Sequence, residues 1–176
     1  MRRFHQDGVA DSSIAAVAND AGIPPGNVFY YFRSKEALTD EVIERWCVRV
    51  GQALDKVADE AAPLDRVRNL LASAKDRRQG YADFGCPLAA LNNDLRNASP
   101  TIATSSGRPL AMIHAWLNAQ FRMMFDDEQA RGHADFCLAG LQGSFALAHA
   151  SGDPQIISRT VDHLGEWLDA LAPRQD

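Results

Sequence analysis

The chain has 176 residues, of which 46% are hydrophobic and 23% are charged, and this composition excludes a long disordered or low-complexity protein. The net charge is −5, and the first 50 residues contain six Lys or Arg against seven Asp or Glu. A generally basic nucleic-acid-binding domain is therefore excluded as well. Any affinity for phosphate must depend on the local placement of a few groups.

The cysteine spacing and the hydropathy pattern suit a reducing, cytoplasmic environment. Cys47, Cys86 and Cys137 lie far apart, with no C-x-x-C pair and no His at ligand spacing, so we expect neither a disulfide framework nor a metal site or cofactor. The N-terminus lacks the apolar run of a signal peptide. No window approaches 18 uninterrupted apolar residues, so no membrane span is expected.

Two short helices separated by a tight turn are predicted near the N-terminus. Ser12 or Ser13 can cap the first, which runs to about residue 21 and is ended by Gly22. The pair Pro24-Pro25 starts the second, which runs to about residue 32, since proline suits the first turn of a helix. Together they form a helix-turn-helix unit.

A long helix is predicted immediately afterwards. Ser34 can cap it, and Glu36 in its first turn is favoured by the helix dipole. Its apolar residues recur every three or four positions, which is the period of an amphipathic helix. These residues are Leu38, Val42, Trp46, Val50, Leu54 and Val57.

The rest of the chain continues the helical periodicity and lacks the alternating pattern of strands. A helix begins at Pro63 and fades into a polar stretch over 75–80, and a loop is expected over 98–109. We expect the helix over 110–125 to be buried, because it is apolar nearly all round. The other predicted helices cover 88–95, 128–149 and 154–171. The sequence thus predicts an all-α protein of about nine helices.

The second short helix carries chemistry suited to DNA. In a helix-turn-helix its N-terminal residues face base edges, where Asn27 can pair with adenine or bond a phosphate. Tyr30 and Tyr31 offer hydroxyls to phosphates and ring edges to thymine methyls. Lys35 lies at the start of the next helix, where dipole and cation both favour a phosphate. The competing interpretation is a tyrosine pair on an amphipathic surface, with Phe29 partly in the core.

The stretch "IAAVANDAGIPPGNVFYYFRSKEAL" resembles the signature of the TetR family of bacterial transcriptional repressors. It contains an A-x-x-A-G-[IV] helix and turn, a G-x-[LV]-[FY]-x-[HY]-F recognition helix, and S-K-E-x-L at the start of the linking helix. The resemblance covers about residues 4–45. It implies a helix-turn-helix DNA-binding domain over 1–45 and a larger ligand-binding and dimerisation domain over 46–176. It further implies a homodimer that binds double-stranded operator DNA and is released by a small hydrophobic molecule.

The family's DNA-contacting positions can be transferred residue by residue. They fall on Ser12, Ser13, Ala15, Pro25, Asn27, Phe29, Tyr30, Tyr31 and Lys35. Two of them differ from the common pattern, because Ala15 occupies a position that is often polar and Pro25 one that is often Lys. The family's first helix also normally begins about ten residues before the position of Phe4. An alternative interpretation is therefore a ligand-binding helical dimer that has lost DNA binding through a shortened first helix.

The resemblance also implies a ligand pocket among the central helices and a dimer surface on the last two helices. The predicted pocket residues are Cys86, Leu88, Leu91, Ile113, His114, Leu117, Phe121 and Phe145. The predicted dimer residues are Gly140, Gly143, Leu147, Val161, Leu164 and Leu168. Met and aromatic residues between 112 and 125 either form core or line an adaptable apolar site.

Enzyme chemistry has no sequence support. The five His residues are scattered, and no H-E-x-x-H, P-loop, G-x-S-x-G or Rossmann pattern occurs. His114 is either a satisfied core residue or a pocket residue that orients a ligand. Cys86 precedes a helix start, where the dipole can lower its pKa and favour redox or electrophile sensing, and the alternative is a buried inert thiol.

Overall fold

The computed structural model describes residues 15, 18–19, 21–59, 62–98 and 105–172. Every regular element in these ranges is helical and none is a strand, so the prediction of an all-α protein is confirmed. The helices are α4 (Pro25–Tyr31), α5 (Lys35–Val57), α6 (Pro63–Asp76), α7 (Arg78–Phe84), α8 (Pro87–Ala98), α10 (Arg108–Phe121), α11 (Asp127–Ser151) and α12 (Gln155–Leu171).

The chain divides into two compact units that are not contiguous in sequence. The first comprises Met1–Arg49 and Pro87–Leu110, and the second comprises Val50–Cys86 and Ala111–Asp176. The sequence-based division at residue 45 places 87–110 in the larger domain, whereas in the structure this segment belongs to the first unit. Local periodicity could not reveal this assignment, because it depends on contacts between residues far apart in sequence.

A tight turn precedes α4 in the first unit. Ala18 and Asn19 are helical, and the N–H groups of Gly22 and Ile23 donate to the carbonyls of Asn19 (3.1 Å) and Ala18 (2.9 Å). Gly22 has φ +65°, a left-handed conformation that glycine adopts without steric cost. The predicted stop of the first short helix at Gly22 is therefore confirmed.

Side-chain contacts connect the start of α10 and the segment before it to other parts of the first unit. The hydroxyl of Ser106, which is buried, donates to Asn92 Oδ1 on α8 (2.9 Å). Arg108 pairs with Glu44 on α5, with an Nη2–Oε2 distance of 3.0 Å. These contacts explain why the segment groups with the first unit. The buried apolar side chains that α5 and α8 contribute to this unit are Ile43, Cys47, Leu88, Leu91 and Leu95.

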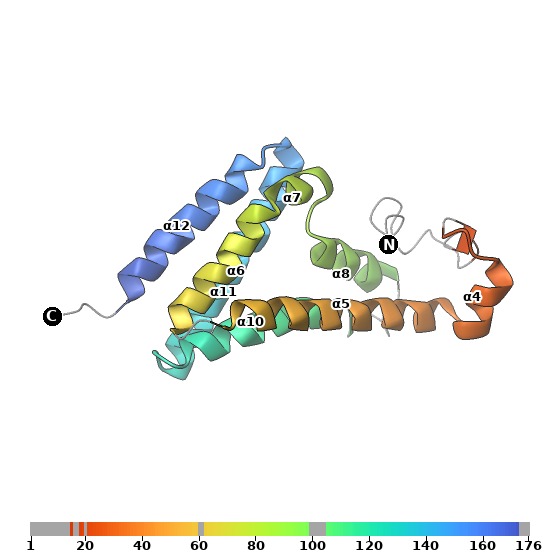
Figure 1. Cartoon of the computed structure of the whole chain (residues 1–176), viewed down its shortest axis with the longest axis horizontal. Coiled ribbons are helices and arrows are strands. Elements are labelled where there is room, and N and C mark those ends of the chain that lie inside the picture. Colours follow the sequence, from red (N-terminus) through yellow and green to blue (C-terminus); the bar gives the residue numbers. More distant parts are fainter. Residues whose placement is uncertain (1–14, 16–17, 20, 60–61, 99–104, 173–176) are drawn as a thin grey trace. The chain divides into compact units, whose positions relative to one another are not determined.

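In the second unit α12 packs against both α11 and α6, and α7 packs against α11 (Figure 1). The four-and-three spacing predicted for the last helix is confirmed, because its apolar positions are buried. The buried residues of α12 are Ile157, Ser158, Val161, Leu164 and Leu168. Ion pairs connect α6 to the outer side of α12, from Arg68 to Asp169 and from Lys75 to Asp162.

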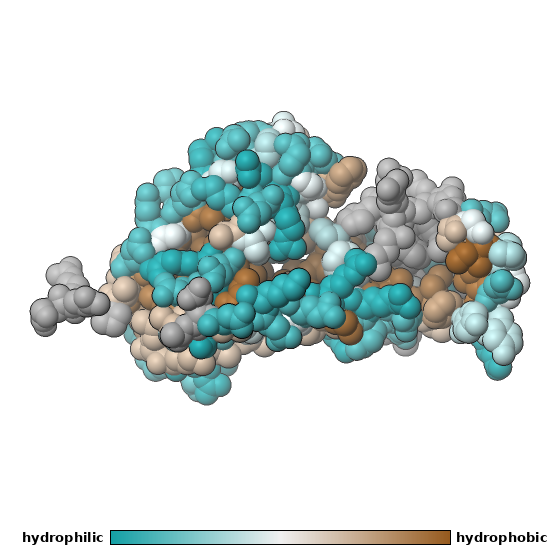
Figure 2. All heavy atoms as spheres, viewed as in Figure 1, coloured by the Kyte–Doolittle hydropathy of each residue, from teal (hydrophilic) through white to brown (hydrophobic). Residues whose placement is uncertain are grey.

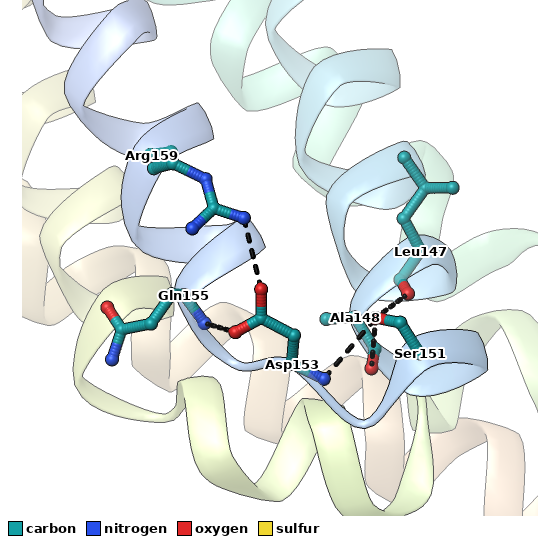
Figure 3. A network of polar contacts seen from close by, with 6 residues as sticks. All are labelled: Leu147, Ala148, Ser151, Asp153, Gln155 and Arg159. Carbon is teal, nitrogen blue, oxygen red and sulfur yellow. Dashed lines mark hydrogen bonds and ion pairs between the residues drawn. The ribbon is translucent and has the colours of Figure 1, made fainter.

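Two acidic side chains accept hydrogen bonds from backbone N–H groups at the starts of α11 and α12. Asp126 caps α11, accepting hydrogen bonds from the backbone N–H groups of Glu128 (3.0 Å) and Gln129 (2.9 Å). Asp153 lies in the turn after α11, where one carboxylate oxygen accepts from the Gln155 N–H (2.9 Å) and the other pairs with Arg159 (3.1 Å) (Figure 3). The carboxylates thus satisfy amides that a helix start leaves unpaired.

Two sequence-based predictions for the central helices are wrong. The polar stretch at 75–80 is helical at both ends, since α6 continues to Asp76 and α7 begins at Arg78. The helix predicted over 110–125 ends at Phe121, after which the N–H groups of Met123 and Met124 bond to the carbonyls three residues earlier, Gln120 and Phe121. This segment is also not buried all round, because Met123 is 60% exposed.

Candidate nucleic-acid interface

Helix α4 is short and is held by its ends. Pro25 occupies its first turn, and the N–H of Phe32 donates to the Val28 carbonyl (2.8 Å) at its C-terminal end. None of its seven residues is buried, although Val28 in the helix and Phe32 directly after it are partly covered. A helix of this length is marginal by itself, so the turn before it and the long helix after it must maintain its geometry.

The exposed face of α4 contains the side chains that the sequence predicts to contact DNA. Tyr30 is 80% exposed and Tyr31 is 75% exposed, and their rings are perpendicular with centroids 5.2 Å apart. Asn27 is also exposed and shares this face, since residues three and four apart lie together on a helix. In Figure 2 the surface at α4 combines a hydrophobic patch with pale, weakly polar atoms.

The remaining predicted DNA contacts are distributed around this face. Pro25 and Ala15 are partly exposed, whereas Ser12 and Ser13 lie outside the described residues. The expectation that Phe29 belongs partly to the core is not met, because its side chain is 48% exposed in a helix that buries nothing. Phe29 thus adds apolar surface to the candidate interface.

The start of α5 combines a cation with two side chains that already satisfy its amides. Lys35 is its first residue, and Ser34 Oγ accepts a hydrogen bond from the Ala37 N–H (3.1 Å), as the predicted cap requires. A hydrogen bond from its own backbone N–H and a second from the Ser34 hydroxyl lower the pKa of Glu36. A phosphate that approaches Lys35 therefore also meets the Glu36 carboxylate, which weakens the attraction there.

The predicted pocket residues belong to two different units. Leu88 and Leu91 are buried in the first unit, whereas Leu117, Phe121 and Phe145 are buried in the second. The remaining predicted residues are Cys86, Ile113 and His114, all of them partly exposed members of the second unit. Each unit therefore holds its own part of the predicted set.

His114 is engaged by a carboxylate rather than left without a partner. Its Nε2 lies 2.6 Å from Asp135 Oδ1, which connects α10 to α11 within the second unit. The sequence-based alternatives were a satisfied core residue and a residue that orients a ligand. The Asp135 contact means that a ligand would share His114 with an existing partner.

A stacked aromatic pair connects α7 to α11 in the second unit, and sequence patterns did not indicate it. The rings of Tyr81 and Phe145 are nearly parallel, with centroids 3.9 Å apart, and burial raises the pKa of Tyr81. One turn further along α11, His149 Nδ1 donates to the Ala82 carbonyl (3.0 Å). These contacts follow from the unpredicted helix α7, whose short polar sequence gave no periodic signal.

The three thiols differ in their accessibility. Burial raises the pKa of Cys137 to about 12, and burial also raises the pKa of Cys47. Both thiols are therefore poor nucleophiles at neutral pH. Cys86 is partly exposed, so among the described thiols it is the one that solvent reaches most readily.

The prediction of the dimer surface is wrong for three of its residues. Val161, Leu164 and Leu168 are buried within the single chain, because α12 turns this face toward its own unit. They are core residues and not surface available to a partner. Gly140 is partly covered by Leu164, whereas Gly143 is exposed and Leu147 is 62% exposed.

Comparisons with known proteins give a family for the N-terminal segment. Residues 1–42 match the family model for "Bacterial regulatory proteins, tetR family". No curated protein sequence matches the chain. The chain thus has a TetR-family N-terminal domain, as the sequence signature indicated.

Solved structures extend this result to the fold of the whole chain. A TetR transcriptional regulator from Legionella pneumophila is 17% identical, with a TM-score of 0.78 over 97% of this chain and 91% of that one. The regulatory protein TetR from Rhodobacter sphaeroides is 18% identical, with a TM-score of 0.78 over 94% and 92% of the two chains. The reduced form of E. coli NemR is 19% identical, with a TM-score of 0.74 over 93% and 89%. The protein has the fold of a TetR-family transcriptional regulator.

Two further findings concern the described residues alone. No described helix is both long and apolar enough to span a membrane. Within the same ranges, no three His, Cys, Asp or Glu side chains are arranged to hold a metal ion.

Proposed function

We propose that this protein is a DNA-binding transcriptional repressor that leaves its operator when a small hydrophobic molecule binds its larger helical domain. The observation that carries the proposal is the exposed face of α4, where Asn27, Tyr30 and Tyr31 point to solvent from a helix that contributes nothing to the core. Exposed aromatic and amide side chains on a helix after a tight turn suit the major groove.

The decisive experiment is fluorescence anisotropy with labelled duplex DNA from the region upstream of the gene that encodes this protein. At about 100 mM salt, where phosphate contacts still contribute, binding should clearly exceed that to a scrambled duplex of equal length. Tyr30→Ala and Lys35→Ala should each weaken operator binding. Operator affinity that is unchanged in both variants would contradict these residue roles. Equal binding to both duplexes would contradict sequence-specific recognition altogether and favour a dimer that binds only a ligand.

Repression is tested with a reporter gene placed behind the same upstream region. Expression should fall when the protein is supplied and should recover in the Tyr30→Ala variant. Increased expression with the wild-type protein would identify an activator instead.

The second unit is the proposed effector domain. Helix bundles commonly hold apolar ligands between their helices, and the partly exposed side chains of α10 and α11 supply apolar and polar groups there. A compound that releases labelled operator should also raise the melting temperature of the free protein, because a ligand stabilises the state that binds it.

A pair of variants separates pocket filling from general damage. Ile113→Trp places an indole at a partly buried position of α10, and Ala115→Trp places the same side chain at an exposed position two residues later. The first should abolish the compound's effect on both anisotropy and melting temperature, and the second should preserve it. Equal responses in both variants would place the effector elsewhere.

We further propose that the protein is a homodimer that pairs through the outer face of α11. Phe136 is 54% exposed and Leu147 is 62% exposed. Between them lie Ala139 and Gly143, both exposed, whose small size allows a partner helix to approach closely. This surface replaces Val161, Leu164 and Leu168 of the sequence-based proposal.

Gly143→Glu tests the dimer directly. A Cβ at Gly143 would meet no atom within 4 Å outside the backbone of its own helix, so the substitution should leave the monomer intact and disturb the partner alone. Sedimentation equilibrium should show a shift from dimer to monomer. Gly80→Glu on α7, where a Cβ would also meet nothing within 4 Å, is the matched control and should remain dimeric. A Gly143→Glu variant that remains dimeric would exclude this surface.

A further inference from the structure

The side chains of α4 restrict which bases this helix can read. The helix has the sequence PGNVFYY and carries no Arg or Lys, which are the side chains that most often read guanine in the major groove. Its exposed hydrogen-bonding groups are the amide of Asn27 and the hydroxyls of the two tyrosines. The helix therefore lacks the bidentate cation that a G·C-centred half-site normally requires.

Asn27 and Tyr30 complement an A·T pair in both polar and apolar terms. An Asn amide can make two hydrogen bonds to adenine N6 and N7, and an apolar ring can contact the thymine methyl group. Asn27 is the third residue of α4, at the end that faces base edges in a helix-turn-helix, and Tyr30 follows one turn later on the same face. Tyr31 packs perpendicular to the Tyr30 ring and thereby limits its orientations.

The two described cations that follow α4 lie in the wrong place for base reading. Arg33 is exposed but follows the end of α4, and Lys35 begins α5, so both lie at the opposite end from Asn27. Cations in such positions contact phosphates, which orient the protein but carry no direct sequence information.

We infer that α4 selects an operator half-site centred on A·T pairs, in which Asn27 reads an adenine and the Tyr30 ring packs on a neighbouring thymine methyl. This inference rests on the proposed DNA-binding function. It assigns specificity to two uncharged side chains and leaves the cations to position the backbone.

The test is selection of duplexes from a random library by the full-length protein, followed by sequencing. Each enriched half-site should contain one adenine whose preference disappears with Asn27→Ala. Replacement of that A·T pair by G·C should weaken wild-type binding about 5- to 150-fold, the range of one bidentate base contact, and should affect the variant little. Removal of N7 with 7-deazaadenine should produce part of the same loss.

Uracil in place of thymine, with two Tyr30 variants, tests the apolar contact. Uracil lacks the methyl group, so DNA with uracil at this position should bind more weakly to the wild type and to Tyr30→Phe, which keeps the ring. The Tyr30→Ala variant has no ring, so its binding should not change with uracil. If Tyr30 instead bonds a phosphate, Tyr30→Phe will weaken binding to all sequences alike, and this outcome would overturn its assigned role.

The outcomes distinguish this inference from the function on which it rests. Enriched half-sites centred on G·C, or an adenine preference that survives Asn27→Ala, would overturn the inference while leaving specific DNA binding intact. A library without any enriched sequence would contradict both the inference and the proposed repressor.

Discussion

Helices α4 and α11 are stabilised in opposite ways. Helix α11 has 25 residues, seven of them buried, and a carboxylate cap with two hydrogen bonds at its start. Helix α4 has seven residues, none buried, and no side-chain cap. The first depends on its own packing, whereas the second depends on the turn and helix that flank it.

This difference shows where sequence can change without loss of the fold. A helix that buries nothing can exchange its exposed side chains at little cost in stability, so its sequence is available for recognition. A helix that fills a core is constrained by volume at each buried position. Under the proposed function, recognition and stability therefore reside in different helices. Substitutions on the exposed face of α4 should weaken DNA binding with little loss of stability, whereas substitutions at buried core positions should lower the free energy of unfolding.

The largest expected loss of stability comes from the core of the second unit. Leu168 is fully buried on α12, so Leu168→Ala should lower the free energy of unfolding by about 2–5 kcal/mol, through lost burial and the resulting cavity. Urea denaturation measures this loss. Met123→Ala is the control, because truncation of a side chain that is 60% exposed and lies outside the proposed dimer surface should cost far less. Equal losses at both positions would contradict the assignment of Leu168 to the core.

A smaller loss is expected at the start of α11. Asp126→Ala removes the acceptor of two backbone N–H groups and should cost about 0.5–2 kcal/mol. Glu128→Ala removes an acidic group from the same turn but leaves the cap intact, so its thermal denaturation should lie closer to that of the wild type. If the two variants are equally stable, dipole electrostatics rather than capping determines the effect.

The elements with strong local signals were predictable from sequence. The Gly22 turn, the Pro25 start of α4, the Ser34 cap and the spacing of α12 all follow from short-range chemistry, and the structure has them where expected. The family signature includes Asn27 and the tyrosine pair, so the exposed face of α4 was also accessible to sequence reasoning.

The missed features depend on contacts between distant segments. No sequence signal near Arg78 predicts the start of α7. This helix is held against α11 by the stacking of Tyr81 on Phe145. The apolar residues of α12 could have faced a partner or their own core, and periodicity alone could not distinguish these alternatives. The membership of 87–110 in the first unit likewise depends on pairs such as Asn92–Ser106.

The turn between α11 and α12 should give a modest pH dependence. Hydrogen bonding to the Gln155 N–H, then to Arg159, lowers the pKa of Asp153 from its ordinary value of 3.8. A carboxyl whose pKa is lower in the folded state stabilises the fold above its unfolded pKa, and this stabilisation is lost as the pH falls through the folded pKa. The wild type should therefore exceed Asp153→Asn in melting temperature at neutral pH, and the difference should shrink below pH 3.8. A difference that stays constant with pH would exclude titration of Asp153 as its source.

The smallest expected change in stability is on α4. Tyr30 is 80% exposed and its ring contacts that of Tyr31, so Tyr30→Ala should change the free energy of unfolding by less than about 0.5 kcal/mol. Alanine also has a higher helix propensity than tyrosine, which offsets part of the lost ring contact. Urea denaturation of this variant must accompany its DNA-binding assay, because both effects are needed to assign its role. Weakened DNA binding at unchanged stability would place Tyr30 in recognition. A loss above about 1 kcal/mol would show that the ring supports α4 itself, and the separation of recognition from stability would then fail at the residue where it should be clearest.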